Sequence, residues 1–304
     1  YQIGEGKAQE LGRLVKSLKA DRVIFANQLS PSQAYNLSKV TGVEVIDRLQ
    51  LILEIFAMRA GSPEAKLQVE YARLRYELPR LRERVRYAMS VEQPGLKGGG
   101  EYEIDVQYDT VKRRLVSLRK KLAQISKRRE QKRKHRRKKG FKLVALAGYT
   151  NSGKSTLLNA LTAGGARVDD MYFTTLTPRT RAIKKCSKVL LTDTVGFIEG
   201  LPPWLVEAFK ATLEEIYLAD LVLLVLDGSD SIPELLRKYR TSAEILKDYG
   251  VKTVIVINKK DLMGERELQE KINLLNGFSS PVVAVSALYG DNLDSLIEII
   301  RGHT

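Results

Sequence analysis

Segment 148–155 carries the clearest chemistry in the chain, because it reads GYTNSGKS and fits the spacing G-x-x-x-x-G-K-S. The apolar stretch 143–147 before it suits a strand, and the leucines at 157, 158 and 161 after it suit an amphipathic helix. A loop in this position points backbone N–H groups and the positive end of a helix dipole at one anion. We therefore predict a polyphosphate-binding loop, with Lys154 on the outer phosphates and the Ser155 hydroxyl on magnesium. The residues expected around the phosphates are Gly148, Asn151, Ser152, Gly153, Lys154, Ser155 and Thr156.

A second apolar stretch, 189–192, is followed by the sequence Asp193-Thr194-Val195-Gly196. The Asp193 carboxylate should lie at the C-terminal end of a strand, which is where open α/β sheets bind their ligands. We expect Asp193 to hold magnesium, through a water molecule. We expect the Gly196 N–H to approach the terminal phosphate, because glycine has no side chain to obstruct it.

Two further segments indicate which base is bound. Asn258-Lys259-Lys260-Asp261 follows the apolar stretch 254–257. The Asp261 carboxylate can accept two N–H groups from guanine, whereas adenine would leave that charge unpaired, and hydrogen-bonded sites of this kind discriminate by about 10⁴-fold or more. Segment 286–288 would close the base pocket with a backbone N–H. Each segment alone fits an ordinary turn, but all four in this order predict a guanine-nucleotide site. The residues expected around the base are Asn258, Lys259, Asp261, Ser286, Ala287 and Leu288.

With these four segments, residues 141–304 resemble the Ras-like P-loop GTPases. Segment 173–178, FTTLTP, is similar to the first switch of the group that contains the Obg, Era and HflX proteins. The resemblance implies that Thr175 completes the magnesium shell when GTP is bound, with Thr174 as the alternative. It also implies GTP hydrolysis that is slow in the isolated enzyme and stimulated by a partner. The implied roles are charge stabilisation by Lys154, γ-phosphate sensing by Thr175 and Gly196, and magnesium binding by Ser155, Thr175 and Asp193.

Phe197 occupies the position after the Asp-x-x-Gly motif, where Ras-type enzymes carry a glutamine that orients the attacking water. A phenyl ring cannot hydrogen-bond water, and a hydrophobic residue here is a feature of the group that this chain resembles. Water placement should then come from other means. Asn151 suggests one, since related enzymes with asparagine at this point of the phosphate loop bind potassium, which offsets transition-state charge. An asparagine that only braces the loop is the alternative.

The first 140 residues require a separate domain, because 304 residues exceed one GTPase module. Stretches 23–26 and 43–46 suit strands around a helix at 31–40, so residues 1–60 should form a small α/β unit. Residues 61–126 carry two apolar seams with spacings of four and three. A glycine-rich segment, 94–101, separates them, and together they predict an antiparallel helical hairpin with a flexible tip. The seams are Leu67, Tyr71, Leu74, Leu78, Leu81 and Val85, and Tyr108, Val111, Leu115, Leu118, Leu122 and Ile125.

This half resembles the amino-terminal domain of the HflX family in segments 45–48 (VIDR), 51–57 (LILEIFA), 66–70 (KLQVE) and 98–101 (GGGE). One departure is 102–105, which reads YEID where family members commonly have TQLE. The resemblance implies that the partner is the ribosome, chiefly its large subunit and its RNA, and that the hairpin tip reaches toward the peptidyl-transferase region. It also implies that binding can split or rescue stalled ribosomes.

A basic run supplies an independent indication of the partner. Residues 127–139 hold ten Lys or Arg against one Glu, a local charge of +9 within the chain's +15. The apolar seam ends at Ile125, so this run is expected to have no buried face and to form a basic linker at 127–140. Nucleic-acid contact through 127–139 and the hairpin tip is the favoured interpretation, by shape and backbone rather than by base sequence. A plain flexible linker, a nuclear-localisation signal and a membrane surface are the alternatives.

Composition argues against several other classes of protein. Cys186 is the only cysteine, and His135 and His303 are the only histidines, which excludes a disulfide framework and makes a zinc site implausible. The sequence has no 18-residue apolar run and no signal peptide, so we expect a soluble cytoplasmic protein.

The expected fold is α/β: a Ras-like P-loop GTPase domain with a mostly parallel sheet at 141–304, preceded by an α/β amino-terminal domain at 1–140 that carries the long hairpin. Two other functions are compatible with the sequence. An RNA-acting GTPase in ribosome assembly or tRNA modification would prefer free precursor RNA or tRNA to mature large subunits. A non-catalytic RNA-binding scaffold, suggested by Phe197, would hold guanine nucleotide without turning it over.

Overall fold

The computed structural model describes all residues except 1, 92–99, 164–178, 187, 199, 203, 206–214, 248–249 and 279, and it describes no side chains within 82–105. The chain divides into two compact units, Tyr1–Ile125 and Ser126–Thr304. The division falls inside a long helix, whereas the sequence suggested a domain boundary at residue 140.

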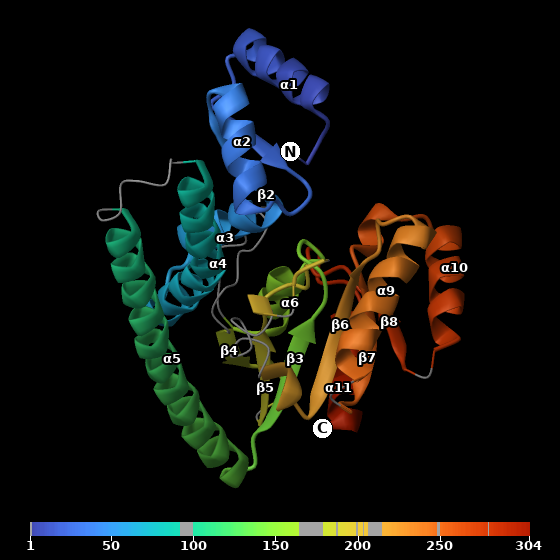
Figure 1. The fold of residues 1–304 in the computed structure, drawn as a ribbon. Coiled ribbons are helices and arrows are strands. Elements are labelled where there is room, and N and C mark those ends of the chain that lie inside the picture. Colours follow the sequence, from blue (N-terminus) through green and yellow to red (C-terminus); the bar gives the residue numbers. More distant parts are fainter. Residues whose placement is uncertain are drawn as a thin grey trace. The chain divides into compact units, whose positions relative to one another are not determined.

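The first unit begins with a small α/β arrangement (Figure 1). Its elements are α1 (Glu5–Leu18), β1 (Arg22–Phe25), α2 (Pro31–Thr41), β2 (Glu44–Asp47) and α3 (Arg48–Arg59), with β1 and β2 paired in parallel. A capping box fixes the start of α2, because Ser30 and Gln33 each accept a hydrogen bond from the backbone N–H of the other. The expected strand, helix and second strand are therefore present. Its core contains Ala8, Leu29, Leu37 and Val45.

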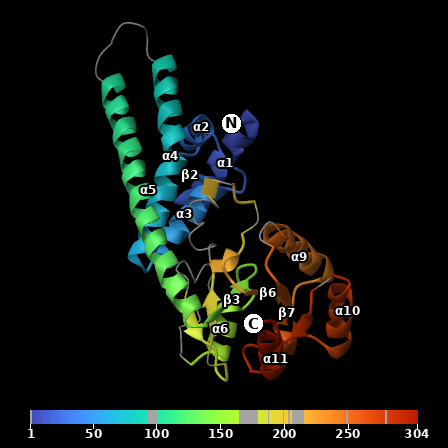
Figure 2. The same cartoon turned by 90° about the horizontal axis from the view of Figure 1, so that it is seen from below.

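Two long helices follow, α4 (Pro63–Val91) and α5 (Gly100–Lys138), which lie side by side in Figures 1 and 2. An ion pair of 2.7 Å joins Arg114 of α5 to Glu70 of α4. Within 106–125 of α5, the side chains turned away from solvent are the six residues of the predicted seam. The predicted seam of α4 is half-buried where it is described, because this helix also packs against α2 and α3 through a second, more buried stripe. That stripe consists of Ala65, Val69, Ala72 and Tyr76.

The basic run continues α5 to Lys138 and does not form the linker expected at 127–140. Arg129, Arg133 and Arg136 are partly buried at the spacing of one helix face, whereas the other seven basic side chains of the run are exposed. The Arg133 guanidinium lies 3.6 Å from the carboxylate of Glu215, which is buried. The expectation of a run without a buried face was therefore wrong. One face of the run packs against the rest of the second unit, to which the run belongs, and the other faces solvent.

The second unit holds a six-stranded sheet in the order β4-β5-β3-β6-β7-β8, parallel except for β4. This order confirms the expected α/β fold with a mostly parallel sheet. The strands are β3 (Lys142–Ala147), β4 (Arg179–Ala182), β5 (Val189–Asp193), β6 (Leu221–Asp227), β7 (Thr253–Asn258) and β8 (Val282–Ala284). The helices are α6 (Lys154–Leu161), α9 (Ile232–Lys247), α10 (Glu265–Asn276) and α11 (Leu293–His303), with a 3₁₀ turn η1 (Lys260–Leu262).

The core of the second unit lies on both faces of this sheet. Leu223 and Val225 of β6 pack with residues of α6 and α11, while Leu224 and Leu226 pack with residues of α9 and α10. A strand covered on both faces needs a continuous apolar run, and LVLLVL at 221–226 is such a run. The sequence analysis identified the apolar stretches of β3, β5 and β7 but missed that of β6.

The carboxyl ends of the parallel strands meet at one edge of the sheet. The phosphate loop follows β3, Asp193 ends β5, Asp227 ends β6 and Asn258 ends β7. The sheet thus brings together residues that are far apart in sequence. Across the described parts of the chain, every helix is too short or too polar to cross a membrane.

Candidate nucleotide-binding site

Two glycines of the phosphate loop stand where a side chain would not fit. Gly148 has a φ of 136°, and a Cβ there would overlap the carbonyl of Val225 in β6. Gly153 has a φ of 88°, and a Cβ there would overlap the side-chain amide of Asn258. Asn151 also has a left-handed backbone, with a φ of 66°, which asparagine tolerates better than most residues. The loop is therefore pressed against the ends of β6 and β7.

Lys154 is buried at the start of α6, and its Nζ donates to the Tyr149 carbonyl at 2.6 Å. Burial lowers the pKa of the Lys154 amino group to about 8, and the neighbouring Asp193 carboxylate opposes this shift. A Cβ on Gly196 would lie 3.0 Å from the Lys154 Nζ, so the Gly196 backbone stands next to the cation. The structure thus brings together the lysine and the glycine that were expected at the terminal phosphate.

Ser155 and Asp193 meet beside this lysine. The Ser155 hydroxyl donates to Oδ2 of Asp193 at 2.7 Å, and the Asp193 side chain is fully buried. A hydroxyl and a carboxylate are hard oxygen donors, which magnesium prefers alongside water and phosphate oxygens. The pair therefore fits a magnesium ion. Thr174 and Thr175, the two candidates for a further protein ligand, lie outside the described residues.

The Asn258 side chain connects the loops around the expected base pocket. Its Nδ2 donates to the Ser152 carbonyl at 2.9 Å, and its Oδ1 accepts from the Ala287 N–H at 3.0 Å. Both functional atoms of Asn258 are therefore used in bracing the phosphate loop and segment 286–288. The side chains of Asp261 and Leu288 are exposed and open to a ligand.

Phe197 belongs to the core of the second unit. Its side chain is 6% exposed and clusters with Tyr149 and Ile216. Its N–H donates to the Gly148 carbonyl at 2.9 Å. The ring therefore fastens the loop after β5 to the phosphate loop, where it cannot orient a water molecule. The Asn151 side chain, by contrast, is exposed.

The two remaining predicted residues of the site have less distinctive surroundings. Thr156 is partly buried in the first turn of α6, and Ser286 is buried just after β8.

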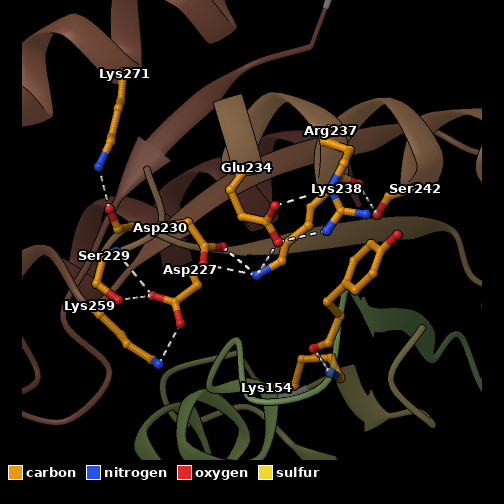
Figure 3. Close-up of polar contacts among 12 residues, drawn as sticks. Lys154, Asp227, Ser229, Asp230, Glu234, Arg237, Lys238, Ser242, Lys259 and Lys271 are labelled. Atoms are coloured by element: carbon orange, nitrogen blue, oxygen red, sulfur yellow. Dashed lines mark hydrogen bonds and ion pairs between the residues drawn. The ribbon is translucent and has the colours of Figure 1, made fainter. Parts of the chain in front are cut away.

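Figure 3 shows a polar cluster next to this site that the sequence analysis missed. Asp227, the last residue of β6, forms an ion pair of 2.6 Å with Lys259. Lys238 of α9 donates to Asp230 at 2.8 Å and lies 5.9 Å from the centre of the Tyr149 ring. A signal was available, since an apolar run that ends in aspartate occurs at 221–227 as it does at 189–193.

Three family models match consecutive parts of the chain. The model described as GTP-binding GTPase N-terminal matches residues 1–57, and the one described as GTP-binding GTPase Middle Region matches 59–136. The model described as 50S ribosome-binding GTPase matches residues 143–259.

Curated relatives and a solved structure match nearly the whole chain. GTPase HflX of Thermococcus kodakarensis is 48% identical over 312 residues, which cover 99% of this chain and 70% of that protein. GTPase HflX of Methanocaldococcus jannaschii is 45% identical over 306 residues, covering 100% of this chain and 76% of that protein. The crystal structure of a GTP-binding protein from Sulfolobus solfataricus in complex with GDP matches with a TM-score of 0.55 at 32% identity. The match covers 99% of this chain and 85% of that chain. The chain therefore belongs to the HflX family of GTPases.

Proposed function

We propose that this GTPase binds and hydrolyses GTP at the carboxyl edge of the second unit's sheet and that it uses the reaction on the ribosome. The observation that carries the site is that the buried Lys154, the hydrogen-bonded pair Ser155–Asp193 and the Gly196 backbone lie next to one another. Lys154 and the loop amides stabilise the charge that develops on the phosphates. Asn258, Lys259, Asp261 and segment 286–288 surround the guanine.

Magnesium would be held by Ser155 and Asp193, with Thr175 as the proposed third ligand, and would neutralise charge on the phosphate oxygens. The Lys154 Nζ donates to the Tyr149 carbonyl, which holds the ammonium on the phosphate loop. Gly196, next to that ammonium, offers its N–H to the γ-phosphate with no side chain in the way.

Asn151 is our proposed ligand for a potassium ion. Its side chain is exposed on the phosphate loop, and Phe197 is buried too deeply to act on water. A monovalent cation beside the phosphates would offset transition-state charge. Hydrolysis should then be faster in potassium than in sodium, and equal rates in the two salts would contradict this role.

The proposed partner is the large ribosomal subunit and its RNA. The description of the family model at 143–259 and the exposed basic face of α5 support this choice. In this proposal the region 1–140 contacts the subunit through the basic run and the predicted hairpin tip at 94–101, of which 94–99 lie outside the described residues, and the region 141–304 hydrolyses GTP. The outcome would be the splitting or rescue of stalled ribosomes, which implies action in the cytoplasm.

The test is GTP hydrolysis with and without purified large subunits, in potassium and again in sodium, at one stated ionic strength. Strong stimulation by large subunits is expected. Nucleotide binding without stimulation would contradict the proposed partner and favour another RNA.

The same assay tests the site. Lys154→Ala should lower the hydrolysis rate by about 100-fold or more, because it removes a charge that stabilises the transition state. The matched control is Lys185→Ala, which removes an exposed lysine outside the site and should leave the rate unchanged. Thermal unfolding would show that both variants fold, and full activity in Lys154→Ala would refute the assignment.

A further inference from the structure

An ion pair beside the proposed guanine pocket has no role in the chemistry derived so far. The Lys259 Nζ lies 2.6 Å from Oδ2 of Asp227. Figure 3 draws this ion pair. The Asp227 side chain is 13% exposed and the Lys259 side chain 25%, so the pair is largely shielded from water. Such a pair interacts more strongly than a surface pair, and losing one partner leaves a shielded charge. Lys259 belongs to the segment 258–261 that is proposed to bind guanine.

The Asp227 carboxylate is oriented by its own loop. Its Oδ1 accepts from the Ser229 N–H at 3.0 Å and from the Ser229 hydroxyl at 2.6 Å. These bonds do not involve Lys259. The direction of Oδ2 is therefore fixed even without the lysine, and Lys259 adopts the position that the carboxylate sets.

The loop is also clamped onto segment 258–261. The Gly228 N–H donates to the Asn258 carbonyl at 2.7 Å, and a Cβ on Gly228 would lie 2.6 Å from that carbonyl oxygen. The buried Lys271 of α10 donates to the Gly228 carbonyl at 2.7 Å and pairs with Glu267. Asp227 is therefore held at a fixed place relative to the backbone that carries Lys259.

The ion pair with Asp227 restricts a Lys259 side chain that would otherwise be free to move. The Lys259 φ of 64° lies in the left-handed region, which is unfavourable for a residue with a Cβ. A free lysine side chain populates many rotamers, and binding a ligand against it would cost the entropy of fixing one. An unpaired ammonium beside a neutral purine would also lose hydration on binding.

We propose that Asp227 is a positioning residue for guanine recognition. It fixes the Lys259 side chain before nucleotide arrives and neutralises its charge, so that the pocket is preorganised on the base side. This inference rests on the proposed nucleotide site at segment 258–261. It predicts that Asp227 governs affinity for the nucleotide and leaves the phosphate chemistry unchanged.

The variant Asp227→Asn removes the charge and little else, because an amide oxygen can still accept from Ser229. Its Kd for a fluorescent N-methylanthraniloyl GDP should rise by about tenfold, which is typical of losing a charge-assisted hydrogen bond. The KM for GTP should rise by a similar factor. The kcat at saturating GTP should stay within about twofold, because no group at the phosphates has changed.

A double-mutant cycle separates positioning from distortion of the loop. Lys259→Met keeps the aliphatic stem without the ammonium and should by itself weaken GDP binding by about tenfold. In that background, Asp227→Asn should cause no further loss. An equal loss in both backgrounds would mean that the loop is distorted, and an unchanged Kd in either single variant would likewise overturn the proposal.

The control variant is Asp294→Asn, which removes the carboxylate of another aspartate–lysine pair, 2.7 Å from Lys185. Its Kd for GDP should equal that of the unaltered protein. A comparable loss in this variant would show that net charge, and not the position of Lys259, sets the affinity. If the unaltered protein fails to bind GDP, the nucleotide site itself is wrong, which is distinct from a site that binds GDP but ignores Asp227.

Discussion

Lys154 shows how a single residue is prepared for its ligand. Its amino group is buried against the Tyr149 carbonyl, and burial lowers its pKa to about 8. The ordinary pKa is 10.5, so between these values the unfolded chain binds more protons at this group than the folded protein does. The free energy of unfolding therefore increases through this group as the pH rises from about 8 to 10.5, and below that window the cost of burying the charge is fully present.

We predict that GDP binding takes up a proton above pH 8. Phosphates favour the ammonium form of Lys154 and raise its pKa, so GDP affinity should fall by up to about tenfold per pH unit above that point. Calorimetry at pH 8.5 in two buffers of different ionisation enthalpy measures the uptake. Arginine stays charged throughout, so Lys154→Arg should lose the pH dependence. The same dependence in that variant would assign the proton to another group.

The arginines of the basic run show that a helix can have a buried face that its sequence pattern does not reveal. Every residue of the apolar seam of α5 within 106–125 was predicted correctly. The prediction needs only the local sequence, because a helix of 3.6 residues per turn brings residues spaced by three and four onto one face. The continuation of that face through the partly buried Arg133 was not predicted, since a charged side chain gives no apolar signal in the sequence. Its burial depends on Glu215, which is distant in sequence and reached only through the fold.

The residues of the candidate site likewise fall into those that the sequence predicted and those that it missed. Lys154, Ser155, Asp193 and Gly196 were predicted together, because the chemistry of phosphate binding restricts residue types at fixed spacings. Asp227 was missed, since its role appears only when β6 and β7 are adjacent in the sheet. The switch residues around Thr175 lie outside the described residues and stay a prediction.

At this scale we predict that Arg133→Gln destabilises the second unit by roughly 3 kcal/mol, because removing one partner leaves the buried Glu215 carboxylate uncompensated. Lys134→Gln is the matched control at the neighbouring, exposed position, where water screens the pair with Glu130 and its loss should leave the stability nearly unchanged. Urea unfolding measures both. Equal stability of the two variants would mean that the Arg133 contact does not hold the helix to this unit.

In the whole molecule, most of the net positive charge lies in one segment of helix α5, and this helix spans the division between the two units. The run 127–139 supplies +9 of the net +15, and seven of its ten basic side chains remain exposed after the helix packs. Helix α5 belongs to the first unit up to Ile125 and to the second from Ser126 onward. The exposed basic face is therefore carried on a helix, and a regular array of cations suits the regularly spaced phosphates of folded RNA.

This arrangement predicts a steep salt dependence. If the exposed face neutralises about six phosphates, affinity for large ribosomal subunits should fall by roughly 10³-fold between 50 and 200 mM salt, because each contact releases a counterion. Removing charges from that face, as in Arg128→Gln or Lys132→Gln, should reduce the logarithmic slope by about one each and weaken binding at low salt. The exposed Lys185 lies outside the run, so Lys185→Gln should leave the slope unchanged. Sedimentation with large subunits across this salt range measures the slope. A slope near zero, or the same slope in all three variants, would mean that the basic face of α5 does not meet RNA, and the first unit would then have to supply the contact.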